Sequence, residues 1–467
     1  MTLSDLEQTP LAALHGLARQ LGIPDYADRR RRDLMYEILE ANADTGAAPP
    51  PDAGRPGSAR AGSARAGSAR TVGRERRRAP RGPIGDAWPD YMQRYDLQTV
   101  RLEGLLRTVG VLETLPDGYG FLRSPEYSYL PSPDDIYVSP SQIKRFSLRL
   151  GDTVDGQVRP PKEGERFFAL IRVHTINGRA PEALQDRTSY DHLTPDYPDA
   201  PLRLETTPDV LATRIVDLVA PIGKGQRGLI VAPPESGRTT LIQQIATAVA
   251  TNDPETRVIV LLVDERPEEA RAMARTLDAL PPQAHVEVIA TTFDDAPERQ
   301  THVAELVLEK ARRLVEARQD VVLLVDSITR LARAYADGDP AAAIRGPKRL
   351  FGAARAVEEG GSLTVIGTAL AGTGRASDAE VLDEFRGSGN MELVLSAELA
   401  EQHIWPAIDL AKSRTRREEM LVPPDRLART RAVRRDLTSL GAADALRALS
   451  DRLADSDSNA AFLDAIG

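Results

Sequence analysis

The sequence predicts a multidomain protein that contains a small N-terminal helical module, a β-barrel and a larger α/β domain with a largely parallel sheet. Short segments of alternating polar and apolar residues, separated by turn residues, occupy residues 99–180, as is typical of a small barrel. From residue 206 onward, apolar runs of strand length alternate with amphipathic segments of helix length, which indicates an α/β domain. The length of 467 residues suits about two to four domains.

The composition excludes several classes of protein. The chain contains no cysteine, which rules out a disulfide framework, a thiolate zinc site and a cysteine nucleophile. The longest apolar runs, such as Val258–Val263, are far shorter than the ~20 residues that a membrane-spanning helix needs. The first residues also lack the charged segment and apolar core of a secretory signal. We therefore expect a cytoplasmic protein with no membrane partner.

The amino-terminal part consists of a helical module and a linker. Residues 1–43 carry leucines at helical spacing, and a second helix is expected over residues 29–43. Residues 44–98 are rich in Arg, Gly, Pro and Ala. Between residues 54 and 82 there are nine arginines and only one acidic residue, Glu75, although the whole chain carries a net charge of −9. The linker is therefore either a flexible, solvated spacer or a basic arm that holds RNA through its phosphates.

The strands of the two larger domains are predicted from their apolar runs. Residues 99–180 form the barrel, residues 181–205 a connector, and residues 206–467 the α/β domain with its C-terminal helices. Barrel strands are expected within residues 110–123, 135–139, 152–158 and 166–173, and sheet strands within residues 228–232, 258–264, 286–291, 321–326, 362–369 and 391–396.

A strand, loop and helix over residues 228–245 carry part of a phosphate-binding motif. The motif reads Gly-x4-Gly-Lys-[Ser/Thr], and its backbone amides and helix N-terminus cradle phosphate. Here Ala232 replaces the first glycine and Arg238 replaces the lysine, whereas Gly237 and Thr239 remain. Taken alone, the segment is equally compatible with an ordinary strand–turn–helix.

Two further strands end in acidic residues. Val260–Glu265 and Val321–Asp326 are apolar runs, and the carboxyl ends of parallel strands meet at one edge of a sheet. There Asp326 is placed to hold Mg²⁺ through water, and Glu265 to orient and deprotonate an attacking water. Either acid alone could simply cap the next helix. The partial phosphate-binding motif and these two strand-end acids occur in the expected order along the chain, and together they predict a nucleoside triphosphatase.

Long strings in the chain are similar to those of the bacterial transcription termination factor Rho family. This family consists of hexameric RNA-dependent ATPases and helicases, and the resemblance covers nearly everything except the linker. The strings are Leu3–Pro10, Asp117–Ser124, Pro133–Ile143, Arg159–Arg166, Pro221–Pro234, Asp264–Glu269, Asp326–Tyr335 and Pro347–Arg355.

For the barrel, the resemblance implies an OB-fold that binds single-stranded, pyrimidine-rich RNA. The implied RNA-binding residues are Tyr119, Phe121, Arg123, Tyr137 and Phe167 in the barrel, together with Arg375. Aromatic rings suit such a site, because stacking contributes ~1–3 kcal/mol per base. Any one of these rings could instead belong to the barrel core, which is the place expected for Phe168. Tyr119 and Phe121 alternate around Gly120, and we expect both rings on one outward face.

For the α/β domain, the resemblance implies a RecA-like ATPase with ATP and Mg²⁺ as cofactors. Its catalytic residues would be Glu265, Asp326, Arg238 and Arg416, and Thr239 and Asp326 would hold Mg²⁺, the latter through water. The implied ATP-binding residues are Gly223, Lys224, Gly225, Gln226, Arg227, Gly228, Glu235, Ser236, Gly237, Arg238, Thr239, Thr240 and Arg266. Arg416 would act as an arginine finger on the neighbouring subunit's ATP, so that catalysis requires a homohexameric ring. The RNA polymerase elongation complex is the implied partner.

Several positions depart from the family pattern. Arg238 and Glu235 stand where the family has lysine, His403 replaces an arginine, and Ala376 replaces a lysine for which Arg375 could substitute. The loop after Tyr335 is about ten residues shorter than in the family, which removes most of its RNA-gripping pore loop.

Two functions remain open on this basis. The first is an active termination factor, in which RNA-dependent ATP hydrolysis drives 5'-3' translocation and transcript release. The second is a divergent paralogue that binds RNA but hydrolyses ATP poorly. A RecA-type recombinase or a rotary ATPase subunit is a weaker alternative, because neither carries an N-terminal OB barrel with these aromatic sequence strings.

Overall fold

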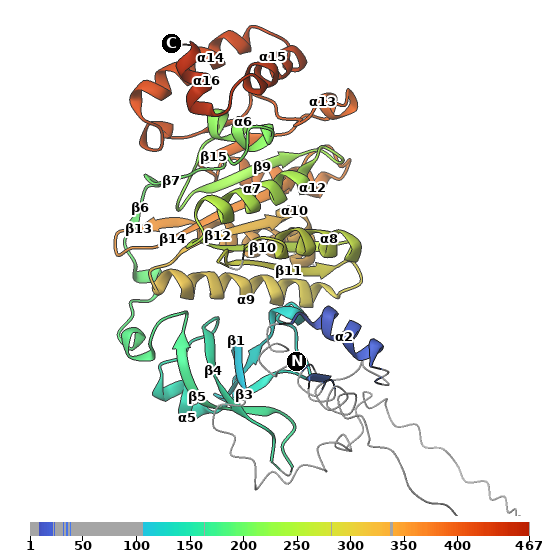
Figure 1. Cartoon of the computed structure of the whole chain (residues 1–467), viewed down its shortest axis with the longest axis vertical. Coiled ribbons are helices and arrows are strands. Elements are labelled where there is room, and N and C mark those ends of the chain that lie inside the picture. The colour runs from blue at the N-terminus through green and yellow to red at the C-terminus, as the bar shows by residue number, and fades with distance from the viewer. Residues whose placement is uncertain are drawn as a thin grey trace, which may run out of the picture. The chain divides into compact units, whose positions relative to one another are not determined.

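The structure is a computed structural model (Figure 1) that describes residues 9–21, 23, 31, 34, 35, 38 and 106–466, except for residues 163, 282 and 337–339. The chain divides by its internal contacts into two units, residues 1–105 and residues 106–467. Most of the second predicted N-terminal helix and the whole predicted linker at residues 44–98 lie outside the described residues. In the described part of the chain, no helix has both the length and the apolar character to cross a membrane.

The first unit contains the helix α2 (Leu11–Gln20). Its buried residues Leu14 and Ala18 form a small apolar cluster with Leu34, Met35 and Ile38. Leu34 and Ile38 are residues that the sequence pattern assigns to one face of the second helix, and their burial confirms that they share an apolar face.

The barrel is a closed sheet of five strands in the order β1-β2-β3-β5-β4. β3 and β5 pair in parallel, and the other neighbours are antiparallel. This closed Greek-key arrangement is the OB-fold. Its elements are β1 (Arg107–Thr114), β2 (Gly120–Arg123), η2 (Pro125–Tyr127), β3 (Ile136–Val138), α5 (Pro140–Arg145), β4 (Thr153–Arg159) and β5 (Phe168–Ile176).

The connector links the barrel to the second domain through short elements. These are η3 (Pro181–Leu184), η4 (Tyr190–His192), β6 (Pro195–Asp196) and β7 (Pro201–Leu202). β6 pairs with β13 (Arg355–Val357), and β7 with β8 (Ile222–Gly223).

The second domain contains a sheet with the central order β11-β10-β12-β14-β9-β15-β16. All pairs from β11 to β15 are parallel, and β16 joins antiparallel to β15. Each of the six predicted sheet strands is confirmed. The strands are β9 (Arg227–Ala232), β10 (Arg257–Glu265), β11 (Val286–Thr292), β12 (Asp320–Asp326), β14 (Ser362–Leu370), β15 (Met391–Val394) and β16 (Arg414–Thr415).

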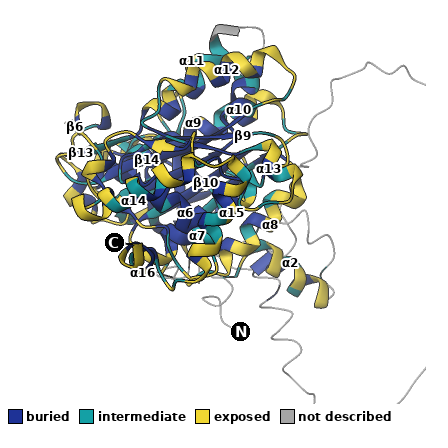
Figure 2. Ribbon diagram, turned by 90° about the horizontal axis from the view of Figure 1, so that it is seen from above, coloured by how far each residue is buried: buried dark blue, intermediate teal, exposed yellow. Residues whose placement is uncertain are grey.

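Helices cover both faces of this sheet, and the strands between them are buried (Figure 2). Alternate residues of each strand point to opposite faces, so that Val260 joins one apolar core and Leu261 the other. One face carries α6 (Leu211–Val219), α7 (Arg238–Asn252), α8 (Pro267–Asp278), α14 (Pro424–Thr438), α15 (Ala442–Ala454) and α16 (Asn459–Ile466). The other carries α9 (Pro297–Glu316), α10 (Ile328–Tyr335), α11 (Pro340–Gly352) and α12 (Ala376–Arg386), while α13 (Ala397–Glu401) and η5 (Glu418–Met420) lie in the C-terminal connections.

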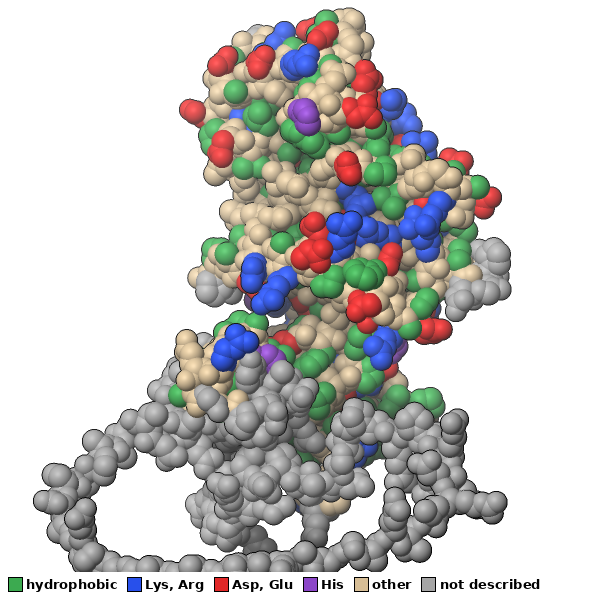
Figure 3. Space-filling model, turned by 90° about the vertical axis from the view of Figure 1, so that its right-hand side faces the viewer, with side chains coloured by type: hydrophobic (Ala, Val, Ile, Leu, Met, Phe, Trp, Pro, Cys, Tyr) green, Lys and Arg blue, Asp and Glu red, His purple; other side chains and the backbone are tan. Residues whose placement is uncertain are grey.

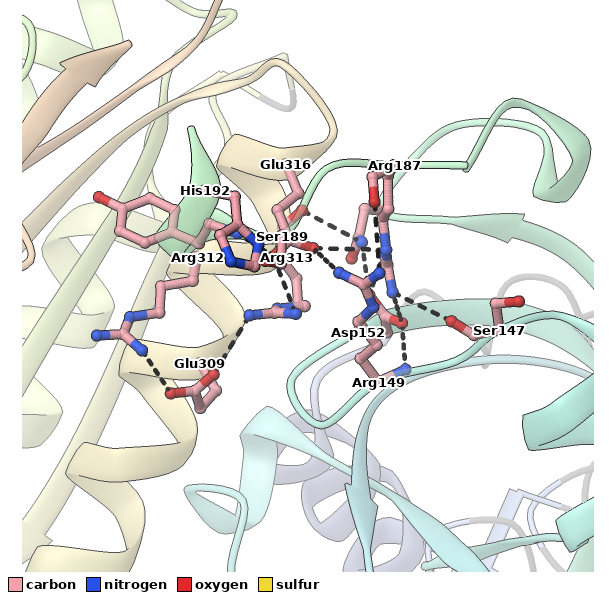
Figure 4. A network of polar contacts seen from close by, with 12 residues as sticks. Ser147, Arg149, Asp152, Arg187, Ser189, His192, Glu309, Arg312, Arg313 and Glu316 are labelled. Atoms are coloured by element: carbon pink, nitrogen blue, oxygen red, sulfur yellow. Dashed lines mark hydrogen bonds and ion pairs between the residues drawn. The ribbon is translucent and has the colours of Figure 1, made fainter. Parts of the chain in front are cut away.

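A buried network of ion pairs joins the barrel to α9 (Figure 4). Arg187 of the connector binds Asp152 of the barrel at 2.6 Å and Glu316 of α9 at 3.4 Å. Glu316 also accepts Arg149 at 3.3 Å and Arg313 at 2.9 Å, and burial raises its pKa above the ordinary value. The side chains of Asp152 and Glu316 are fully buried. Each carboxylate therefore depends on its arginines, because a buried charge that loses its partner costs several kcal/mol.

Candidate nucleotide and RNA sites

The predicted phosphate loop connects β9 to α7. Gly237 precedes α7 with a left-handed backbone, φ 79°, and a Cβ at this position would lie 2.8 Å from the ring of Trp405. Ser236 is buried and its hydroxyl donates to the carbonyl oxygen of Pro233 at 2.7 Å, while Glu235 also has a positive φ of 59°. The loop thus presents the free amides of a fifteen-residue helix, a site that favours phosphate.

The two predicted carboxylates lie at the same edge of the sheet as this loop. Glu265 ends β10, Asp326 ends the neighbouring strand β12, and both are buried. Asp326 Oδ2 lies 3.4 Å from the hydroxyl oxygen of Thr239, and Asp326 Oδ1 accepts a 2.8 Å hydrogen bond from Thr368. The described residues contain no cluster of three His, Asp or Glu side chains that could hold a metal. A hydroxyl and a single carboxylate are nevertheless the protein ligands that suit Mg²⁺ bound with nucleotide phosphates.

Arg238 occupies the space between these carboxylates. Its Nε lies 2.8 Å from Asp326 Oδ1, and its Nη2 lies 3.7 Å from Glu265 Oε2. Glu265 is also bound by Arg330, with 2.6 Å between Nη1 and Oε2. The arginine that replaces the motif lysine therefore bridges the predicted Mg²⁺-binding carboxylate and the predicted general base.

Two residues of this site were missed from the sequence. Arg330 lies one turn after Asp326 on α10, and this spacing from a strand-end acid could have indicated it. Trp405 comes from a distant loop, remains 48% exposed and covers Gly237. Its only sequence signal is rarity, since the chain contains two tryptophans.

The remaining predicted residues at this edge begin helices. Thr240 lies in the first turn of α7. Arg266 precedes α8, is exposed, and donates its backbone N–H to Glu265 Oε1 at 3.1 Å. Figure 3 shows the side of the molecule where α8 and α12 lie in Figure 1, and Lys and Arg side chains gather there across the second domain beside several acids.

The predicted ATP-binding segment Gly223–Gly228 lies at the opposite edge of the sheet. Lys224 pairs with Asp320, the first residue of β12, and with Asp253, both at 2.7 Å. Asp326, the last residue of the same strand, lies beside the predicted phosphate loop, so that about 20 Å of strand separates the two groups. One chain therefore does not bring Gly223–Gly228 and Glu235–Thr240 together.

Arg416 also lies at this amino-terminal edge. It follows β16, which pairs with the first residues of β15, and its backbone N–H donates to the Asn390 carbonyl oxygen at 2.8 Å. Arg416 is exposed, and no described residue forms an ion pair or hydrogen bond with its guanidinium. An arginine side chain is too short to cross the sheet, so that Arg416 cannot reach the phosphate loop of its own chain.

The barrel carries four aromatic rings on one outward face. The ring centroids of Tyr119 and Phe121 are 5.9 Å apart, those of Tyr119 and Tyr137 are 5.8 Å apart, and those of Phe121 and Phe167 are 4.9 Å apart. All four side chains are partly exposed, whereas Phe168 is buried, as expected. The outward face predicted for Tyr119 and Phe121 is confirmed, and the rings form an aromatic platform.

The two predicted RNA-binding arginines have different surroundings. Arg123 is buried, with Nε 2.6 Å from Glu113 and Nη1 paired with Asp135, while its guanidinium lies 5.3 Å from the centroid of the Phe121 ring. Its donors are engaged by protein carboxylates, and it supports the platform from below. Arg375 precedes α12 and is exposed.

Fold and site together define an ATP-hydrolysing phosphate-loop enzyme joined to an OB-fold barrel. Family models agree with each part: residues 5–47 match the Rho termination factor N-terminal domain, residues 108–182 its RNA-binding domain, and residues 212–415 the nucleotide-binding domain of the ATP synthase alpha/beta family. The N-terminal and RNA-binding matches cover the helical module and the barrel, and the third covers the parallel sheet.

Curated relatives match along nearly the whole chain. Transcription termination factor Rho of Pseudomonas fluorescens biotype C is 43% identical, over 99% of this chain and 98% of that protein. The factors of Thermotoga maritima and Escherichia coli K12 are each 42% identical over 99% of this chain, and over 96% and 99% of their own lengths. Among solved structures, an ATPase of a type III secretion system matches with a TM-score of 0.49 and 22% identity, over 59% of this chain and 86% of that chain.

The chain belongs to the Rho transcription termination factor family. The relatives support the active termination factor, and nothing in the comparisons supports the divergent alternative.

Proposed function

We propose that this chain terminates transcription as a homohexameric, RNA-dependent ATPase of the cytoplasm. The barrel binds pyrimidine-rich nascent RNA, ATP hydrolysis moves the ring 5'-3' along it, and the transcript is released from the RNA polymerase elongation complex. The observation that carries the proposal is that the phosphate loop lies at one edge of the sheet and Arg416 at the other. This placement supports a nucleotide site that a second copy of the chain completes with its own Arg416.

The residues of the phosphate-loop edge bind ATP and activate water. The amides before α7 hold the phosphates, and Trp405 beside Gly237 offers a ring on which the adenine base stacks. Glu265 orients the attacking water and accepts its proton, and Arg330 holds that carboxylate in place. Thr239 and, through water, Asp326 would hold Mg²⁺, which would neutralise charge on the phosphates. Arg238 moves from Asp326 to the phosphates as ATP enters.

The residues of the opposite edge act on the neighbour's ATP. Arg416 is exposed and its guanidinium is available for the transferring phosphoryl group of the adjacent subunit. Such a finger contributes about 10³–10⁵ in rate. The segment Gly223–Gly228 lies beside it and supports this edge, since Asn390 binds both the Arg227 backbone N–H at 2.9 Å and the Gln226 side chain at 2.6 Å.

The aromatic platform supplies the contact with RNA. Four partly exposed rings accept stacked bases in any order, which suits a single strand. The exposed Arg375 lies on the second domain and offers a further phosphate contact.

Mixing two inactive variants tests the composite site, in which the phosphate loop and Glu265 come from one copy of the chain and Arg416 comes from the neighbouring copy. Glu265→Gln and Arg416→Ala proteins should each hydrolyse ATP poorly with RNA present. In mixed rings some interfaces combine an intact Glu265 with an intact Arg416, so that activity should return. If the mixture stays as inactive as its components, although native mass spectrometry shows mixed rings, the composite site is wrong.

A transcription assay tests the biological function. The protein should release a pyrimidine-rich transcript from a paused elongation complex when ATP is added, and a non-hydrolysable analogue should not support release. Transcript release that proceeds equally without hydrolysis would contradict the proposal.

A further inference from the structure

A half-exposed tyrosine lies against the turn that carries Arg416. The Arg417 guanidinium carbon is 3.9 Å from the centroid of the Tyr197 ring, closer than in any other arginine–aromatic pair of the described residues. Tyr197 is 52% exposed, so that its ring does not belong to the apolar core and its face is open to contact with Arg417. A cation over an aromatic face is attracted by the quadrupole of the ring.

The flanking residues of Tyr197 fix its place. Asp196 belongs to β6, which pairs with Ala356 of β13, and its side chain accepts the Tyr197 backbone N–H at 2.7 Å. Pro198 packs so closely on Gly223 that a Cβ on this glycine would lie 2.9 Å from the Pro198 Cβ. The tyrosine therefore projects from a backbone held on both sides.

The turn that carries Arg416 is held by its own neighbours. Thr415 donates its hydroxyl to the Pro221 carbonyl oxygen at 2.7 Å. After the turn, Glu418 accepts Arg431 and Arg434, each at 3.0 Å. Between these anchors, Arg417 has a left-handed backbone, φ 55°, which is uncommon for a residue other than glycine.

We propose that Tyr197 is a positioning residue, which holds Arg417 and thereby directs the adjacent Arg416 toward the neighbouring subunit's ATP. This inference rests on the proposed function of Arg416 as an arginine finger. In this role Tyr197 acts through Arg417, whose guanidinium lies over its ring, and is not itself a catalytic residue. It acts by stabilising the turn conformation in which Arg416 projects from the edge of the sheet.

The physical reason is preorganisation. An arginine finger on a flexible surface turn samples many directions, and ordering it costs conformational entropy in each catalytic cycle. The stack on Tyr197 restricts the turn before ATP is hydrolysed. Because the finger acts on charge that develops in the transition state, losing this restriction lowers kcat and leaves the KM for ATP unchanged.

Four proteins test the inference in RNA-stimulated ATP hydrolysis by the full chain: Tyr197→Leu, Tyr197→Phe, Arg417→Gln and the double variant Tyr197→Leu with Arg417→Gln. We expect Tyr197→Leu to lower kcat about 3- to 30-fold with an unchanged KM. Tyr197→Phe, which keeps the ring face, should restore most of the rate. The double variant should be no slower than the slower single variant, because both changes remove the same contact.

A control and a reference variant complete the design. Phe146→Leu removes a similar stack under Arg145 in the barrel, at 5.3 Å, and should leave kcat unchanged. Circular dichroism and sedimentation verify that each variant folds and forms the same oligomer. Arg416→Ala shows how much rate the finger supplies.

The outcomes separate the two proposals. If Arg416→Ala abolishes hydrolysis while Tyr197→Leu keeps the unaltered kcat, the positioning role is wrong and the arginine finger stands. A raised KM without loss of kcat would also overturn it, because Tyr197 would then bind the nucleotide directly. Additive losses in the double variant would show that the two residues act separately. If Arg416→Ala hydrolyses ATP at the unaltered rate, the proposed finger itself is wrong.

Discussion

Replacing Arg238 by lysine restores the residue that the phosphate-loop motif requires. In the structure, Arg238 contacts Asp326 at 2.8 Å through Nε and Glu265 at 3.7 Å through Nη2, and its side chain is only 12% exposed. In the proposed mechanism, ATP displaces this bridge before Asp326 acts on Mg²⁺ and Glu265 acts on the attacking water. A lysine ammonium has all its donors on one nitrogen, whereas Arg238 reaches the two carboxylates from two different nitrogens, so that we expect lysine to keep the contact with Asp326 and to lose the longer one with Glu265.

The magnitude follows from the contact that lysine loses. The energy of a partly buried ion pair is intermediate between that of an exposed ion pair and that of a charge-assisted hydrogen bond. We therefore take the contact with Glu265 to contribute about 1 kcal/mol. ATP binding would be easier by that amount in Arg238→Lys, which corresponds to a KM about fivefold lower. The kcat should change by less than about threefold, because the bridge is already broken in the bound state.

The assay is steady-state ATP hydrolysis with oligo-cytidine RNA, measured over a range of ATP concentrations. Arg386→Lys is the matched control, since Arg386 forms an exposed ion pair with Glu392 at 3.3 Å, and its KM should not change. An unchanged or higher KM in Arg238→Lys would refute the bridge as an obstacle to ATP. A kcat that rises by orders of magnitude would instead show that the natural site is impaired, as in the divergent paralogue.

Three further predictions address the platform, the base and the pH dependence. Phe121→Ala should weaken binding of oligo-pyrimidine RNA by ~1–3 kcal/mol in fluorescence anisotropy, with an unchanged KM for ATP, and equal RNA affinity would remove the platform from the RNA site. Trp405→Ala should raise the KM for ATP about 3- to 10-fold through lost stacking, and an unchanged KM would place the base elsewhere. Burial raises the pKa of Asp217 to about 7, above the ordinary value near 4. Between these values the folded chain holds a proton that the unfolded chain has released, so that stability falls as pH rises from about 4 to 7, by at most about 4 kcal/mol. Asp217→Asn should flatten the decline of Tm over this range, and an identical decline would contradict the assignment.

The large elements could be predicted because their apolar runs are long. Parallel strands covered on both faces must be apolar throughout, and for this reason Val258–Val263 and Val321–Val325 indicated strands directly. The acids that end them, Glu265 and Asp326, could be assigned to one edge by the same reasoning. β6, β13 and β16 have two or three residues each, too few for any periodicity to appear.

The missed parts of the site depend on contacts between distant segments. Trp405 reaches Gly237 from more than 160 positions away, and no local pattern records that approach. Arg123 lies two residues after Phe121 in the sequence, yet its carboxylate partners are Glu113 of β1 and Asp135, which directly precedes β3. The placement of Gly223–Gly228 at the far edge of the sheet follows from the strand that separates it from the phosphate loop.

The most direct test of the account is ATP hydrolysis by the purified protein with and without oligo-cytidine RNA at moderate salt. The proposed function predicts slow hydrolysis alone and a large increase with RNA, because the barrel and the composite nucleotide site belong to one RNA-driven enzyme. If the protein binds the RNA tightly but hydrolyses no ATP, the central claim is contradicted.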